Sequence, residues 1–256
     1  MKIIVVCNRK GGCGKSSTAG AMFSYLGTVA HKRVALVDFD SQCNVSYALG
    51  GDLAAPSLYD VLTGCIDIRE SLQAVPEDVS DSYLLAGSDL LSNIDNGTDT
   101  VTVNFREELQ KLENLVDYVI VDTAPALALL TGLALSVADN VVVPVVADIY
   151  NIQGMQGIGE LVSEVNPEAS IIGILMTRYR GRLLAVQKIE EMAGDVAEQM
   201  GVKLFSTKIR EGVTVVEAAM MRKGLFSYDP EMKSNVAQDY AAFMEEFLKE
   251  VGSNGE

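Results

Sequence analysis

The sequence has no tryptophan and only 6% aromatic residues, so its core must be built mainly from aliphatic side chains. It also lacks any apolar run long enough to span a bilayer, which takes about 20 residues. No repeat, low-complexity tract or linker divides the 256 residues, a length suited to one large α/β domain. Because Met1 leads directly into an apolar run, we expect no targeting peptide and no N-terminal helix-turn-helix domain ahead of the fold.

Cysteine is scarce and confined to the first quarter of the chain. The four cysteines are Cys7, Cys13, Cys43 and Cys65, and none has C-x-x-C spacing. This pattern fits a reduced, cytoplasmic setting in which the thiols act as small apolar residues rather than metal ligands.

Basic residues are outnumbered, with 20 Lys and Arg against 35 Asp and Glu and a net charge of −15. Such a balance argues against a protein that coats itself in nucleic acid. Residues 178–223 depart from it, with nine basic and six acidic side chains. On charge alone this segment fits solvated helix faces as well as a binding patch.

Short apolar runs alternate with stretches of helical periodicity. The runs predict strands at residues 3–6, 34–37, 83–86, 118–121, 141–146, 171–176 and 202–205. Helical spacing covers residues 15–29, 102–114, 152–165 and 183–200. We therefore expect a single α/β domain over residues 1–251, with a doubly wound, mostly parallel sheet flanked by helices. Residues 50–99 should decorate one sheet edge, and the tail 252–256 should fray.

The segment between the first strand and the first helix is the most informative part of the chain. It reads Lys10-Gly11-Gly12-Cys13-Gly14-Lys15-Ser16-Ser17. Glycines let backbone N–H groups converge on phosphate oxygens, and a helix start adds the positive end of its dipole. Lys15 supplies a point charge and Ser16 a hydroxyl suited to Mg²⁺. Strand, loop, lysines and hydroxyl coincide, which favours a phosphate-binding loop over an incidental glycine turn.

Carboxylates follow two of the expected strands. Asp38 and Asp40 come after the second run, where their spacing of two points both side chains the same way. They suit a nucleotide site, although a pair of acids capping the next helix is the alternative. Asp122 ends the apolar run 118–121, the form of a Walker B element that holds Mg²⁺. Carboxyl ends of parallel strands meet at one sheet edge, where ligands bind.

These motifs resemble those of the ParA/MinD ATPases, from Met1 to about Val251. The loop is similar to the family's deviant Walker A motif, K-G-G-x-G-K-[ST], with Arg9 where the common phosphate loop has glycine. Ser41 replaces the usual proline of D-x-D-P-Q, and Ala124 departs slightly from D-x-P-P. Residues 209–218 resemble the adenine-side segment, with Arg210 one place early and Gly212 at the asparagine position.

The resemblance implies an ATPase that binds ATP and Mg²⁺. By it, Asp40 orients the attacking water, and Lys10 crosses to the partner subunit's nucleotide, so that the ATP form is a homodimer. Asp38 would support the metal shell or the loop. The implied nucleotide contacts are Gly11, Gly12, Cys13, Gly14, Lys15, Ser16, Ser17 and Arg210, and the implied metal-site residues are Ser16, Asp122 and Asp38.

Several branches of the family compete. A ParA-type partition ATPase, binding DNA nonspecifically and stimulated by a ParB-like partner, is favoured; protein-cargo positioning and an ATP-switched regulator with little turnover stay open. No cysteine follows Cys65, which disfavours the iron–sulfur branch, and the missing C-terminal tyrosine cluster disfavours the tyrosine kinases. The candidate DNA contacts are Arg178, Arg180, Arg182, Arg222 and Lys223, with Tyr179 able to pack among the arginines. The ATP form would then be associated with the nucleoid.

A MinD-like membrane anchor is disfavoured by the last helix. Its charged residues sum to −3, which anionic lipid would repel. We therefore expect no stable membrane anchor and expect its apolar stripe to pack in the core. The stripe consists of Val236, Tyr240, Phe243, Phe247, Leu248 and Val251.

Overall fold

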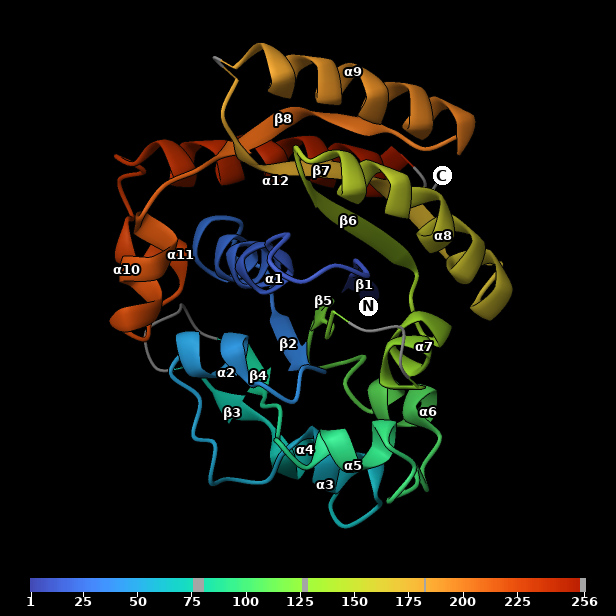
Figure 1. Ribbon diagram of the computed structural model, residues 1–256. Coiled ribbons are helices and arrows are strands. Elements are labelled where there is room, and N and C mark those ends of the chain that lie inside the picture. The colour runs from blue at the N-terminus through green and yellow to red at the C-terminus, as the bar shows by residue number, and fades with distance from the viewer. Residues whose placement is uncertain (76–80, 126–128, 182, 254–256) are drawn as a thin grey trace.

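The computed structural model describes residues 1–75, 81–125, 129–181 and 183–253. One sheet of eight strands, in the order β3-β4-β2-β5-β1-β6-β7-β8, forms its centre (Figure 1). All neighbouring pairs are parallel except β3 and β4. The strands are β1 (Lys2–Val6), β2 (Val34–Asp38), β3 (Gln73–Ala74), β4 (Ser82–Leu85), β5 (Tyr118–Asp122), β6 (Asn140–Val146), β7 (Ser170–Tyr179) and β8 (Leu204–Arg210). The expected mostly parallel α/β sheet is confirmed.

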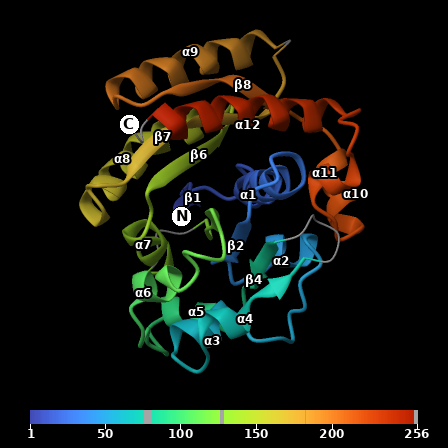
Figure 2. The same ribbon diagram turned by 180° about the vertical axis from the view of Figure 1, so that it is seen from behind.

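Helices cover both faces of this sheet. They are α1 (Lys15–Ser24), η1 (Tyr25–Val29), α2 (Asn44–Ala48), α3 (Leu58–Leu62), α4 (Ile68–Ser71), α5 (Leu91–Asp95), α6 (Phe105–Gln110), α7 (Leu129–Ser136), α8 (Ile149–Val165), α9 (Leu184–Gln199), α10 (Thr214–Met220), α11 (Leu225–Tyr228) and α12 (Asn235–Ser253). β8 runs between α9 and α12 in both views (Figures 1 and 2).

Alternation along the strands divides the core in two. On β1, Ile3 and Val5 pack into a cluster with α3 and α6 to α9, whereas Ile4 and Val6 pack with α1, α11 and α12. Strands buried on both faces explain why their sequences are continuous apolar runs rather than alternating ones.

Several elements differ from expectation: the helix expected over residues 102–114 covers only Phe105–Gln110, and the strand expected at 171–176 spans Ser170–Tyr179. The helix expected over residues 15–29 is α-helical to Ser24 and π-helical from Tyr25 to Val29. The strand expected at 202–205 begins at Leu204 and continues to Arg210. The two-residue strand β3 was not predicted, because so short a segment carries no readable periodicity.

The apolar stripe of α12 lies in the core, as predicted. Tyr240, Phe243 and Phe247 are at most 2% exposed, and Val236 and Val251 are also buried. α12 continues through Gly252 and Ser253, two residues of the expected tail, while 254–256 lie outside the described residues. Within the described part of the chain, no helix combines the length and apolarity needed to cross a bilayer.

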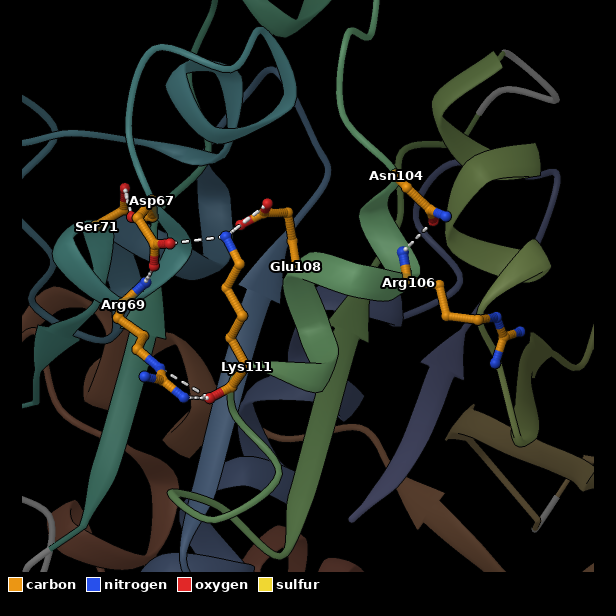
Figure 3. Close-up of polar contacts among 7 residues, drawn as sticks. All are labelled: Asp67, Arg69, Ser71, Asn104, Arg106, Glu108 and Lys111. Atoms are coloured by element: carbon orange, nitrogen blue, oxygen red, sulfur yellow. Dashed lines mark hydrogen bonds and ion pairs between the residues drawn. The ribbon is translucent and has the colours of Figure 1, made fainter.

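Short helices and loops decorate one sheet edge, as expected for residues 50–99. Figure 3 shows how polar contacts tie α4 to α6 there. The Lys111 ammonium lies 2.7 Å from carboxylate oxygens of both Asp67 and Glu108, and the Arg69 guanidinium donates to the Lys111 carbonyl. These side chains and the Lys111 carbonyl hydrogen-bond and ion-pair with one another, which helps to hold α4 against the end of α6 at this sheet edge.

Candidate nucleotide-binding site

The phosphate loop links the end of β1 to the start of α1. Gly12 (φ 74°) and Gly14 (φ 87°) both lie in the left-handed region, where a side chain would be strained. Gly14 is the N-cap of α1 and has no side chain to cap it, so the first backbone N–H groups point toward an incoming anion. Lys15 is buried, and its ammonium donates to the Lys10 carbonyl at 3.0 Å. The predicted strand–loop–helix arrangement is confirmed.

Two residues that the sequence did not single out hold this loop in place. The Asn8 side chain donates to the Pro144 carbonyl at 2.6 Å and accepts from the Lys10 N–H. The Thr177 hydroxyl donates to the Cys13 carbonyl at 2.7 Å. Pro144 lies on β6 and Thr177 on β7, both far from the loop in the sequence. These contacts are therefore visible only in the folded sheet.

Asp122 ends β5 and is fully buried. Neither carboxylate oxygen has a hydrogen-bond partner among the described residues. Burial is the main cause that raises the pKa of Asp122 well above its usual value; nearby Asp38 raises it further, while Ser16 and Lys15 lower it. A buried, unpartnered carboxylate beside a serine hydroxyl fits Mg²⁺, which takes one or two protein oxygens and completes its shell with phosphates and waters.

The metal would have few protein ligands in this site. The described residues contain no group of three His, Cys, Asp or Glu side chains that could enclose a metal ion. Ser16 and Asp122 would supply two oxygen ligands, which suits Mg²⁺ with phosphates and waters completing its shell.

We expect Asp122→Asn to stabilise the nucleotide-free protein at neutral and higher pH. Because the folded state holds the Asp122 proton more tightly than the unfolded chain does, this group favours folding at low pH and that contribution is lost as pH rises. Asparagine stays polar but never ionises, and each pKa unit of this difference is worth about 1.4 kcal/mol, or roughly 3–6 °C in Tm at this chain length. Thermal melts of both proteins between pH 5 and pH 8 should show a gap that widens with pH. A gap that is constant, or narrows, would contradict the prediction.

Asp38 and Asp40 follow β2 but differ in their contacts. Asp38 is fully buried; its oxygens accept from the Ser46 hydroxyl at 2.6 Å and from the N–H groups of Ser46 and Asp40 at 3.0 Å each. The pKa of Asp38 is raised to about 6, with burial as the main cause and the hydrogen bonds from Ser46 and Asp40 opposing it. The Asp40 carboxylate accepts from the Gln42 N–H at 2.9 Å and also lines the nucleotide cavity. Asp38 thus supports the loop, and Asp40 reaches the cavity.

A cavity of about 610 Å³ lies over the phosphate loop, within the size range of nucleotide and cofactor pockets. Its walls come from the loop, the segment after β2, the end of β7 and the segment after β8. Residues predicted for the nucleotide site that line it are Gly11, Gly12, Gly14, Lys15, Ser16, Ser17, Asp40 and Arg210; Arg178, predicted as a DNA contact, also lines it. Cys13 lies beneath the loop, with its thiol donating to the Lys10 carbonyl.

Comparison with known proteins agrees with this geometry. A family model described as an AAA domain matches residues 1–171. The sporulation initiation inhibitor protein Soj of Bacillus subtilis is 33% identical over 270 aligned residues, covering 99% of each chain. The chromosome-partitioning ATPase Soj of Thermus thermophilus is 33% identical, over 97% of this chain and 96% of that one.

The chain belongs to the ParA family of ATPases. Its fold also matches cobyrinic acid a,c-diamide synthase from Mycobacterium smegmatis, solved with a bound ATP analog and magnesium. The TM-score is 0.81 at 24% identity, with 99% of this chain and 97% of that chain covered. At this identity the likeness concerns the fold alone.

In this ParA-family ATPase, Arg210 is held by α12. Its guanidinium forms a two-point contact with Asp239, at 2.6 and 2.8 Å. Arg210 lines the cavity from this fixed position, and a role beside the adenine stays a prediction.

The candidate DNA contacts are engaged within the protein. Arg178 and Arg180 both pair with Glu211, Arg178 at 3.1 Å. The Arg222 guanidinium lies over the Tyr47 ring and donates to the Gly51 carbonyl at 2.6 Å. Lys223 lines a neighbouring cavity between α1, α2 and α10, and Arg182 lies outside the described residues.

The Tyr179 hydroxyl donates to Glu190 instead of packing among the arginines. Glu211, one of the six acidic residues of the segment 178–223, partly neutralises the two arginines expected to form a basic face.

Three of the four cysteines are small buried residues, as predicted. Cys7, Cys13 and Cys43 are buried, and burial raises the pKa of Cys7 to about 11, so its thiol stays protonated. Cys65 is exposed, so for it the prediction was wrong: it follows Gly64 on a surface turn after α3, where nothing covers the side chain.

Proposed function

We propose that this ParA-family ATPase acts in DNA partition, as a cytoplasmic protein that dimerises on ATP and then associates with the nucleoid. In this proposal it binds DNA without sequence preference, and a ParB-like partner stimulates ATP hydrolysis. The observation that carries the nucleotide part is the glycine loop with its buried lysine facing an unpartnered buried aspartate. The Soj relatives, one of them named a chromosome-partitioning ATPase, support the partition part.

The chemistry that we propose combines the positions of the loop residues with the roles implied by the family resemblance. Lys15 and the N–H groups of the loop would hold the β- and γ-phosphates, and Ser16 and Asp122 would hold Mg²⁺. Bound Mg²⁺ would neutralise charge on the phosphates. Asp40 orients water from the cavity wall, while Lys10 extends from the head of the loop to a second subunit. When the γ-phosphate leaves, Lys10 loses its contact across the dimer, which then opens.

A DNA titration tests the partition function. Fluorescence anisotropy with duplex DNA of unrelated sequences, with and without ATP·Mg²⁺, should show binding only with ATP. Affinity should fall steeply between about 50 and about 200 mM salt, with a log–log slope near −0.9 per phosphate neutralised. Arg180→Glu combined with Arg182→Glu should abolish binding and leave the ATP dimer intact. Absence of DNA binding at low salt would reject DNA partition.

Glu211 provides a second prediction for the same assay. Because it pairs with Arg178 and Arg180, Glu211→Gln should release both guanidinium groups and tighten DNA binding by about 3- to 10-fold. Glu164→Gln, at an exposed position of α8, changes the net charge equally and should have a smaller effect. Equal effects of the two changes would mean that only net charge matters.

Protein-cargo positioning is the second candidate function, favoured by an exposed apolar surface around α10. Val213, Val216 and Met220 recur on one side of this helix at 68%, 60% and 75% exposure, with Met221 following. An apolar helix face suits a protein partner better than a phosphate backbone. A wild-type protein that dimerises with ATP but does not bind DNA even at low salt would support this candidate.

A further inference from the structure

We propose that Ser46, on α2, is a positioning residue for ATP hydrolysis. The inference rests on the proposed function, in which Asp40 orients the attacking water. Ser46 does not reach the nucleotide cavity; it acts through Asp38, which in turn holds the backbone of Asp40.

The first step in this chain is the contact between Ser46 and Asp38. Both residues are fully buried. The Ser46 hydroxyl donates to Asp38 Oδ2 at 2.6 Å, and the Ser46 N–H donates to the same oxygen at 3.0 Å. The start of α2 is thereby fastened to the end of β2.

The second oxygen of the same carboxylate carries the contact to Asp40. Asp38 Oδ1 accepts from the Asp40 N–H at 3.0 Å, so the orientation of the Asp38 carboxylate sets where the Asp40 backbone lies. One side chain therefore links α2 to the residue whose carboxylate faces the cavity.

The chain after β4 also contacts Ser46, Asp38 and Asp40, through Gly87. The Gly87 N–H donates to the Ser46 hydroxyl at 3.0 Å. A Cβ at Gly87 would lie 2.9 Å from the Asp40 carbonyl oxygen and 3.2 Å from Asp38 Cγ, so the chain after β4 approaches as closely as glycine allows. The Ser46 hydroxyl thus donates on one side and accepts on the other, which an alanine cannot do.

Ser46→Ala should slow hydrolysis without weakening nucleotide binding. The backbone N–H of residue 46 still bonds Asp38, so the start of α2 is kept and the loss falls on the orientation of Asp38 and Asp40. Since a misplacement of about 1 Å near reacting groups can cost 10²-fold, we expect kcat to fall by about 10-fold or more. The KM for ATP should change by less than about 2-fold, because no phosphate contact is removed.

Steady-state ATPase assays on the full chain test this, with melting temperatures measured in parallel. The set comprises wild type, Asp40→Ala, Ser46→Ala, Ser46→Thr and Ser24→Ala. Threonine restores the hydroxyl and should keep turnover within about 3-fold of wild type. Ser24, the last residue of α1, is the matched control: it is also fully buried, and its hydroxyl accepts from the Phe226 N–H at 3.0 Å. Ser24→Ala should lower Tm and leave kcat unchanged.

The outcomes separate this inference from the proposed function. The positioning role is supported if Ser46→Ala lowers kcat, Ser46→Thr restores it, and Ser24→Ala leaves it unchanged. If Asp40→Ala loses turnover but Ser46→Ala behaves like Ser24→Ala, or if threonine and alanine are equally slow, the inference is overturned and the proposed function stands. If Asp40→Ala turns over ATP like wild type, the proposed role of Asp40 fails and the inference fails with it.

Discussion

Asp40→Ala is expected to lower ATP turnover by about 10²-fold or more while ATP affinity holds or rises. The Asp40 carboxylate lies in the cavity wall, and its predicted partner is the attacking water rather than a phosphate. Removing it should therefore leave the ATP-bound state intact and prolong the dimer. Single-turnover and steady-state ATPase assays, together with light scattering in ATP·Mg²⁺, measure both effects.

The chain offers a matched control for Asp40. Asp40 also stabilises a turn, by accepting from the Gln42 N–H at 2.9 Å. Asp52 makes the same kind of contact with the Ala54 N–H at 2.9 Å, on an exposed loop. If Asp40→Ala and Asp52→Ala are equally active, Asp40 acts only as a turn residue and its assignment to water is wrong.

Lys10→Ala is expected to keep ATP binding and to lose the ATP-dependent dimer. The loop depends on the backbone of Lys10: its N–H donates to Asn8, and its carbonyl accepts from Cys13 and Lys15. Alanine preserves these contacts, so the loop should still hold phosphate. The proposed contact across the dimer is removed with the Lys10 side chain, so light scattering with ATP·Mg²⁺ should report monomers.

Two further variants give this experiment its controls. Arg9→Ala removes the neighbouring positive charge and should still dimerise, because the Arg9 guanidinium lies against Gly157 of the same chain. Lys15→Ala should lose nucleotide binding altogether. A Lys10→Ala protein that forms the ATP dimer would contradict the assignment of Lys10 to the partner subunit.

Much of the fold could be predicted from the sequence because the strands are buried on both faces. Continuous apolar runs such as the one at residues 141–146 are easily read, and each became a strand close to its predicted position. The last helix was also interpreted correctly, since its acidic residues argued against lipid and left the core as the place for its apolar stripe. The change from α- to π-helix at Tyr25 depends on packing, which no local pattern reports.

The motifs that bind phosphate were predictable, but the residues that hold them were not. Thr177 reaches the loop from 164 positions away in the chain, and Asn8 reaches Pro144 across 136. Gly87 and Ser46 meet across 41 residues. Such contacts exist only once the sheet has brought its strands together, so a search for local spacing cannot find them.

Charge counting over residues 178–223 could not show which charges pair. The sum already subtracts Glu211, but only the fold shows that this glutamate pairs with both Arg178 and Arg180. The pairing of one glutamate with two arginines depends on β7 and β8 being neighbours, which the sum does not contain.

The contact between the Lys15 ammonium and the Lys10 carbonyl has a consequence for the nucleotide cycle. An ammonium has three donors, so Lys15 can keep this bond and still offer the others to phosphate. The loop is then shaped before any nucleotide arrives, and product can depart without the loop having to refold. Each round of exchange would start from the same resting geometry. In the proposed dimer, the difference between the ATP and ADP states must then lie in the contact between the two subunits and not in the conformation of the phosphate loop.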